Sequence, residues 1–600
     1  MAENSRELLR LYGLGILSAT DVQRLAAAAG RDGWGANSAI AKKLIKCGGS
    51  GRLTGNVNRD LLCAVSLSGI VSGSLKPYTM HLPDGSSLEI ILPHEALPDL
   101  LTRTASSVGP WTLGDRAATD ILGAVLRKWA ADPDVMYPLD VSGVAALGLH
   151  SDGVQYTSTN RAGGAKSVEV ISMNVLSAGA ERHRQSRIPL VVLRKARMCH
   201  CGCGGFDTLQ SIFQVLAWSF RCLLTGVAPD CRHDGSDFTA YDKRVRLAPG
   251  TALPPAALVQ MRGDWEGLVK LFRFRSYNSE DFCWECDAST AAGPCNYKGC
   301  SPMAGHRATL MTHEAYMTRC AAEGSQPSYI FRCPGFRLEM ICVDSMHAAD
   351  LGCFADGLGS IFSLEVGNHQ WTPNQQAGLA SLNQRLNAWY KANRAHSGSK
   401  VTPVVLSQIN NKTLGYPFLK AKAAQVRHLA EFGLELANLH KFGMAAAPGR
   451  AARAPFRFSA SHRLAGRENE HLDLQIRMFH GMAAYTRSLS AAEFDSTACR
   501  DSMLQFLSSL SALNTLWRVG ATQAVEKAAP FHFRVKAHML QHLVLDHVPI
   551  FGSPAKFWCY RDEDYVGAVK SICARTKHPA TLERRVLEKL RILQGLGVFV

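Results

Sequence analysis

The sequence predicts an α/β fold: a mixed-sheet core, a large and mostly α-helical insertion that interrupts this core, and a small mixed module before it. Three observations support the prediction. Residues 141–280 hold apolar runs in the order strand, strand, strand, helix, strand. Residues 281–535 carry mainly helical periodicity, and residues 536–600 include two amphipathic helices that we expect to complete the core. Residues 1–140 mix short helices with a hairpin and are expected to form the module.

The composition is typical of a folded protein with a polyanionic partner. Of the 600 residues, 46% are hydrophobic and 19% are charged, which excludes disorder as the main state. The longest apolar stretch, 211–228, contains Gln214 and Arg221 and falls short of the ~20 apolar residues of a membrane span. The first residues lack the apolar region of a secretory signal, so we expect a cytosolic or nuclear protein. The net charge of +16 favours a partner such as nucleic acid.

Two features define the N-terminal module. Residues 5–30 have the spacing of two short helices, with Thr20 or Asp21 as the N-cap of the second helix and Gly30 beyond its end. Residues 77–93 alternate apolar and polar side chains around Asp84-Gly85, which predicts a hairpin. No chemistry is evident in this module.

Four strands and one helix make up the first part of the core. The strands are expected at 144–156, 166–177, 187–196 and 255–263. The helix is expected at 207–225, with Asp207 as its cap and Gly226 just past its end.

The later part of the chain is predicted to be helical. Helices are expected at 374–394, 418–440, 469–489 and 500–518, with a loop rich in Ala, Arg and Pro at 444–455. Two further amphipathic helices are expected at 558–576 and 581–593.

Three carboxylates are candidates for two-metal phosphodiester chemistry, which needs about three acidic side chains around two hard cations. Asp152 ends the first strand, Asp264 follows the fourth strand, and Glu563 lies in the first turn of a late helix. Each also has a structural interpretation. Asp152 and Asp264 suit turns, and Glu563 suits the helix dipole as a solvated first-turn acid.

Three separated segments share motifs with a known family. They are YRDEDYVGAVKSICARTKHP (560–579), VDSMHAADLG (343–352), and GDWEGLVKLF followed by Cys283-Trp284-Glu285-Cys286. Together they resemble the CACTA (En/Spm-type) DNA transposases. Six positions of the late-helix pattern match in register: Tyr560, Glu563, Tyr565, Gly567, Lys570 and Pro579. The family's first aspartate motif is reduced to Asp152-Gly153, and Asp564 stands where the family has Arg.

The resemblance implies an RNase H-like core with a DDE triad of Asp152, Asp264 and Glu563, holding two Mg²⁺ or Mn²⁺ ions. It implies cleavage of double-stranded DNA at transposon ends and strand transfer by the freed 3′-hydroxyl. It also implies a nuclear location and a dimer or higher oligomer that pairs two DNA ends. The alternative is a catalytically inactive, transposase-derived protein that binds DNA or chromatin, or a degenerate copy.

Asp344 and His347 are candidates for a further role at this active site. They lie three residues apart in the D-x-M-H string of the resemblance, so on a helix Asp344 would orient the His347 ring toward a phosphate. The alternative is a helix cap at Asp344 with His347 in a packing role.

The 18 cysteines are expected to be reduced, which favours metal ligands, core residues or free thiols over disulfides. Cys283 and Cys286 have the spacing of a zinc-chelating pair, and we predict a structural zinc site completed by Cys300 and His306. Cys295 or His313 are substitutes, and free cysteines in a loop are the alternative.

Two other groups are interpreted more simply. Cys199, Cys201 and Cys203 alternate along the chain and so point to opposite sides unless Gly202 and Gly204 supply a turn, which favours a structural or incidental role. His538 and His542 are expected to pack in the core.

A basic stretch follows the late helix and is expected to contact the DNA backbone, with a solvated helix face as the alternative. Its candidate residues are Lys570, Arg575, Lys577, Arg584 and Arg585.

Overall fold

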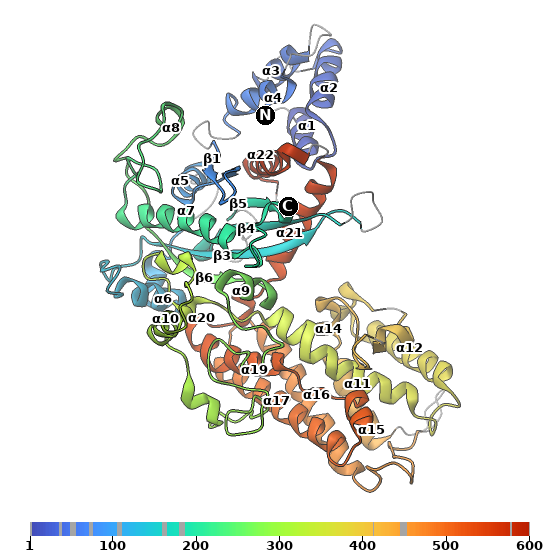
Figure 1. The fold of residues 1–600 in the computed structure, drawn as a ribbon. Coiled ribbons are helices and arrows are strands. Elements are labelled where there is room, and N and C mark those ends of the chain that lie inside the picture. Colours follow the sequence, from blue (N-terminus) through green and yellow to red (C-terminus); the bar gives the residue numbers. More distant parts are fainter. Residues whose placement is uncertain are drawn as a thin grey trace. The chain divides into compact units, whose positions relative to one another are not determined.

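The computed structural model divides the chain into two compact units (Figure 1). Unit 1 comprises Met1–Arg273, His313–Ile341 and Tyr560–Val600, and unit 2 comprises Phe274–Thr312 and Cys342–Cys559. The structure describes residues 3–34, 39–48, 56–70, 76–104, 111–158, 165–178, 186–401, 403–411, 413–443, 453–576 and 579–598. The expected insertion, 281–535, is therefore bounded differently, because unit 2 begins at Phe274, excludes 313–341 and extends to Cys559.

Unit 1 is built on a four-stranded mixed sheet, which confirms the expected α/β class. Its strands are β3 (Ala145–Gln155), β4 (Ser167–Val175), β5 (Arg187–Arg194) and β6 (Ala256–Arg262). Their order in the sheet is β5-β4-β3-β6, with β3–β4 and β4–β5 antiparallel and β3–β6 parallel. Nearly every residue of these strands is buried, as expected where both faces of a sheet are covered.

Helices from two distant parts of the chain pack on the sheet. Helix α7 (Phe206–Thr225) packs against β6, α21 (Tyr560–Arg575) against β3, and α22 (Leu582–Gly595) against β5. The N-cap of α7 is Gly205 rather than the predicted Asp207, which lies in the first turn. Gly226 ends α7 in the left-handed conformation, as predicted.

The hairpin of β1 (Tyr78–His81) and β2 (Ser87–Ile90) turns at Gly85, as predicted. It lies against the sheet, because the Ile91 amide donates to the Leu190 carbonyl at 2.8 Å. Helices α5 (Pro93–Thr104) and α6 (Ile121–Ala130) follow. The hairpin is thus part of unit 1.

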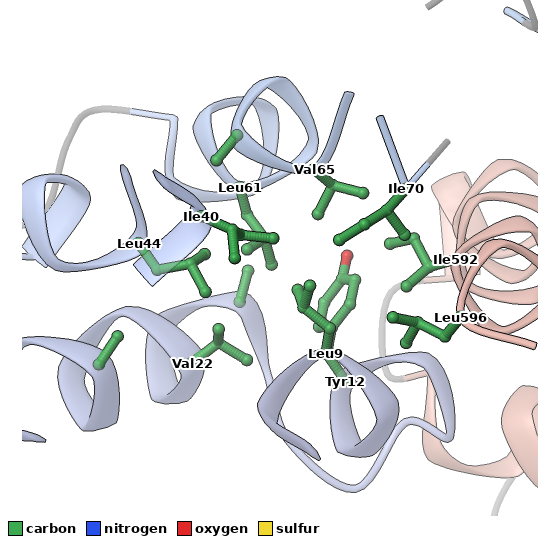
Figure 2. Close-up of a cluster of buried hydrophobic side chains, with 13 residues drawn as sticks. Leu9, Tyr12, Val22, Ile40, Leu44, Leu61, Val65, Ile70, Ile592 and Leu596 are labelled. Carbon is green, nitrogen blue, oxygen red and sulfur yellow. The ribbon is translucent and has the colours of Figure 1, made fainter. Parts of the chain in front are cut away.

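The N-terminal helices share a core with the C-terminal helix (Figure 2). They are α1 (Glu3–Gly13), α2 (Ala19–Arg31), α3 (Ala39–Gly48) and α4 (Val57–Ser66). Ser18, not Thr20 or Asp21, caps α2, because its side chain accepts the Asp21 amide while the Asp21 carboxylate accepts the Ser18 amide. The helix also runs through Gly30 to Arg31.

Replacing Leu9 by Ala is expected to destabilise unit 1 by about 3 kcal/mol, because Leu9 is fully buried in this cluster beside α22. The measurement is the urea midpoint of the full chain. Leu25→Ala in α2 is the control, since Leu25 is 47% exposed. Equal midpoints for the two variants would contradict the shared core.

Unit 2 is mainly helical, as the periodicity predicted. Its longer helices are α11 (Phe354–Gly367), α12 (Gln375–Ala392), α15 (Ala430–Phe442), α16 (Glu468–Ser490) and α17 (Ser496–Arg518). Most of the predicted loop at 444–455, namely residues 444–452, lies outside the described residues. The described helices of both units are each too short or too polar to cross a membrane.

Candidate active site and metal centre

Asp152 and Asp264 follow paired positions of two parallel strands, β3 and β6. His150 pairs with Arg262 across the two strands, and Asp152 and Asp264 each stand two residues further along. Asp152 is within β3 rather than at its end, opposite Val170 of β4. Asp264 directly precedes α9 (Trp265–Phe272), and its Oδ1 accepts the Gly267 amide at 2.6 Å. One oxygen of Asp264 therefore caps a helix.

Glu563 is positioned by its neighbour Asp562. The Asp562 carboxylate is buried and ion-pairs with Arg187 of β5 and with Arg262 of β6, at 3.0 Å from Arg262 Nε. Burial alone would raise the pKa of Asp562, but these two guanidinium groups hold it far below its usual range. The first turn of α21 is thereby fixed on the sheet, and Glu563 lies in that turn, partly exposed.

The three predicted carboxylates thus belong to one unit and to adjoining elements. They are not among the groups of described residues whose ligand atoms all lie within 4.8 Å of one another. A fourth carboxylate, which the sequence did not single out, is Glu169 of β4, which is buried and accepts the Ser151 hydroxyl at 3.0 Å. Burial raises the pKa of Glu169, Lys195 lowers it, and the negative charge of Asp264 raises it further.

Asp344 and His347 form a hydrogen-bonded pair in unit 2. The Asp344 carboxylate accepts from His347 Nδ1 at 2.6 Å and from the backbone amides of Met346, His347 and Cys559. Burial would raise the pKa of Asp344, and these hydrogen bonds, with that from His347 first, lower it. The carboxylate therefore caps a helical turn and orients the imidazole.

A buried group of Cys283, Cys286, His538 and His542 in unit 2 could hold zinc. Cys283 Sγ lies 3.5 Å from His542 Nε2, and Cys286 Sγ lies 3.3 Å from both His538 Nε2 and His542 Nε2. The two imidazole nitrogens are 3.0 Å apart. Tetrahedral zinc separates sulfur from nitrogen by about 3.5 Å and two nitrogens by about 3.3 Å. The donor set and its spacing fit a zinc ion.

A carboxylate behind His542 orients this histidine for the role. Asp546 accepts from His542 Nδ1 at 2.6 Å, which leaves His542 Nε2 toward the cysteines, and Arg307 in turn holds Asp546 by two hydrogen bonds of 2.7 Å. The hydrogen bond from Cys283, with those from the histidines, lowers the pKa of Cys286, which favours the thiolate, the form that binds metal. Burial would lower the pKa of His542, but Glu285 and Asp546 raise it to about 9.

Two of the four predicted zinc ligands are wrong. Cys300 and His306 are not part of the group: the Cys300 thiol faces the Lys298 carbonyl at 3.5 Å, and His306 Nε2 bonds the Gln541 side chain at 2.9 Å. The proposed substitute His313 belongs to unit 1 and accepts the Leu338 amide. His538 and His542, assigned to packing from the sequence, take their places. They lie one turn apart on α19 (Val535–His542), a spacing that suits two ligands on one helix face.

The basic residues of the C-terminal segment differ in their surroundings. Lys570 and Arg575 are exposed, although Arg575 also donates to the Leu14 carbonyl at 3.1 Å. Arg584 and Arg585 both ion-pair with Glu588 at 2.9 Å. Lys577 lies outside the described residues. Because α22 packs in the core, the stretch is not a continuous solvated face.

No family model matches this chain, and no curated protein is similar enough in sequence to be counted as related.

Proposed function

We propose that unit 1 is a metal-dependent nuclease core of the RNase H-like, DDE-transposase type, which cleaves double-stranded DNA and transfers the cut strand. The observation that carries the proposal is the placement of Asp152 and Asp264 two residues beyond paired positions of the parallel strands β3 and β6. The chain order of strands and helices, with α21 packed on β3, agrees with such a core.

Asp152, Asp264 and Glu563 would hold two Mg²⁺ or Mn²⁺ ions. Such ions lower the pKa of an attacking water and stabilise the charge on the attacking and leaving oxygens. Water adds to the phosphorus, the bond to the 3′-oxygen breaks, and the products are a 3′-hydroxyl and a 5′-phosphate. In the second step the freed 3′-oxygen forms a bond to a phosphorus of the target strand, and the target's own bond between that phosphorus and its 3′-oxygen breaks. The target's 3′-oxygen leaves as a hydroxyl, so the proton lost by the attacking hydroxyl is balanced.

Groups of the chain restrain two of the three proposed ligands. The ion pairs of Asp562 with Arg187 and Arg262 hold the start of α21 on the sheet, so Glu563 is positioned without a flexible linker. The Gly267 amide fixes one oxygen of Asp264 and leaves the other for a cation. In unit 2 we propose a structural zinc held by Cys283, Cys286, His538 and His542. The net charge of +16 favours DNA as the partner. A nuclear location and two copies that pair two DNA ends are part of the proposal because the family resemblance implies them.

Nicking of supercoiled plasmid DNA in Mg²⁺ or Mn²⁺ tests the proposal. We expect Asp264→Asn to reduce the nicking rate more than about 100-fold, because it removes a metal-binding charge. Asn also caps helices, so α9 should remain folded. The matched control is Asp115→Asn, an exposed acid of the same unit, which should nick like the parent chain.

Two results would contradict the nuclease. One is the absence of nicking at any concentration of either metal. The other is DNA binding that depends on neither the metal nor Asp264, which would instead identify a non-catalytic DNA-binding protein.

A further inference from the structure

The loop between β5 and α7 gathers four metal-binding side chains that the proposed nuclease does not use. Cys199 Sγ and Cys203 Sγ are 3.2 Å apart, and Cys201 Sγ lies 3.0 Å from Cys203 Sγ. The carboxylate of Asp207, through Oδ2, lies 3.3 Å from Cys201 Sγ. The ligand atoms of all four residues lie within 4.8 Å of one another.

Three glycines make this arrangement possible. Cysteines at alternate positions of an extended chain point to opposite sides. Here Gly202, Gly204 and Gly205 adopt φ values of +92°, +67° and +91°, a region that side-chain-bearing residues rarely enter. The loop therefore curls, and its three sulfurs face one point. The turn at Gly202 and Gly204, which the sequence allowed but did not establish, is therefore present.

Neighbouring groups hold the loop against the start of α7. The Cys199 amide donates to Thr208 Oγ1 at 2.9 Å, and the Asp207 amide points at Cys203 Sγ at 3.5 Å. Asp207 Oδ1 faces Arg273 Nη2 at 3.7 Å, while its Oδ2 faces the cysteines. The Arg273 guanidinium stacks on Phe206, 3.9 Å from the ring centre. The carboxylate is thus oriented by a cation, which would also offset the negative charge of cysteines bound to a metal ion.

The sulfur separations show free cysteines and not a disulfide. A disulfide bond is about 2.0 Å long, and sulfurs in tetrahedral zinc sites are about 3.8 Å apart. The observed 3.0 and 3.2 Å lie nearer the second value, and the glycines allow the remaining adjustment. Three sulfurs and one carboxylate oxygen are a donor set that zinc accepts.

We propose that Cys199, Cys201, Cys203 and Asp207 form a second zinc site, which fastens the β5–α7 loop to the first turn of α7. Cys201 and Asp207 are exposed, whereas all four residues of the group in unit 2 are buried. The second site should therefore exchange its metal with solvent faster than the buried one. The proposal does not depend on nuclease activity.

The test is the zinc content of the purified, reduced full-length chain, measured by elemental mass spectrometry after buffer exchange. We expect the double variant Cys201→Ser/Cys203→Ser to hold one zinc fewer per chain than the parent. Cys63→Ser is the matched control, since Cys63 is an exposed cysteine of unit 1 outside the loop, and it should hold the parent amount. Asp207→Asn should retain the zinc but bind it more weakly in competition with a chelator.

A second measurement, made on the parent chain, tests the proposal even if the double variant does not fold. In the parent chain, added Zn²⁺ should slow alkylation of Cys201 by iodoacetamide at least about 10-fold, and it should leave Cys63 alkylation unchanged. Equal zinc content in the parent and the double variant would overturn the proposal. An alkylation rate of Cys201 that added zinc leaves unchanged would also overturn it. So would a disulfide in this loop, detected in the non-reduced chain as a mass lower by two hydrogens.

Discussion

Cys286→Ser is expected to empty the zinc site of unit 2 and to destabilise that unit by at least about 4 kcal/mol. A ligand present at a thousand times its Kd stabilises the native state by about 4 kcal/mol. Structural zinc usually contributes more than this to the free energy of folding. The variant also leaves Cys283, His538 and His542 buried without the cation that their spacing suits. The measurements are bound zinc and the thermal midpoint with and without a chelator.

Cys300→Ser is the control for this experiment. Its sulfur was predicted to be a ligand but lies outside the group, so the variant should keep both the zinc and the thermal midpoint of the parent. A chelator should lower the midpoint of Cys300→Ser but not that of Cys286→Ser. If Cys300→Ser loses zinc while Cys286→Ser keeps it, the assignment of Cys286 as a ligand is wrong.

Asp562→Ala is expected to cost unit 1 about 3–5 kcal/mol, the usual effect of removing one partner from a buried ion pair. Two guanidinium groups, of Arg187 and Arg262, would remain buried without their counter-charge. The measurement is the free energy of unfolding from urea titration. Asp564→Ala on the same helix is the control, because Asp564 is exposed and should change stability by less than about 0.5 kcal/mol.

The ion pairs of Asp562 with Arg187 and Arg262 also predict how the stability of unit 1 depends on pH. The pKa of Asp562 is lower in the folded chain than its unfolded value of about 3.9, so its contribution is complete above that value. It is lost as the pH falls below about 4, because protons then bind the unfolded chain first. The difference in unfolding free energy between the parent and Asp562→Ala should therefore shrink in acid. A difference that grows as the pH falls would contradict the assignment.

The sheet could be predicted from the sequence because its strands are unusually apolar. The runs that became β3, β4, β5 and β6 were placed within about two residues. Caps were harder. Asp207 has the chemistry of an N-cap, yet Gly205 precedes the helix because the glycine-rich loop before it already turns the backbone. Helix ends depend on such loop geometry, which local residue preferences do not contain.

The candidate sites were predicted in part for a similar reason. Cys283 and Cys286 are close in sequence, so their spacing indicated a chelating pair. Their partners lie more than 250 residues away, on α19, and no local pattern links the two segments. For Asp562 a signal did exist: it shares the helical spacing of the buried Tyr565, Val566 and Val569, which places it on the apolar face of α21.

Unit 1 is assembled from three stretches of the chain, and the last begins only at Tyr560. During synthesis the ribosome releases Arg187 and Arg262 long before it reaches Asp562 and Glu563. At roughly 5–20 residues per second, the nascent sheet waits on the order of tens of seconds for its acidic helix. A polypeptide interrupted anywhere in that interval retains the strands but lacks Asp562, so the buried Arg187 and Arg262 would have no counter-charge until α21 is made.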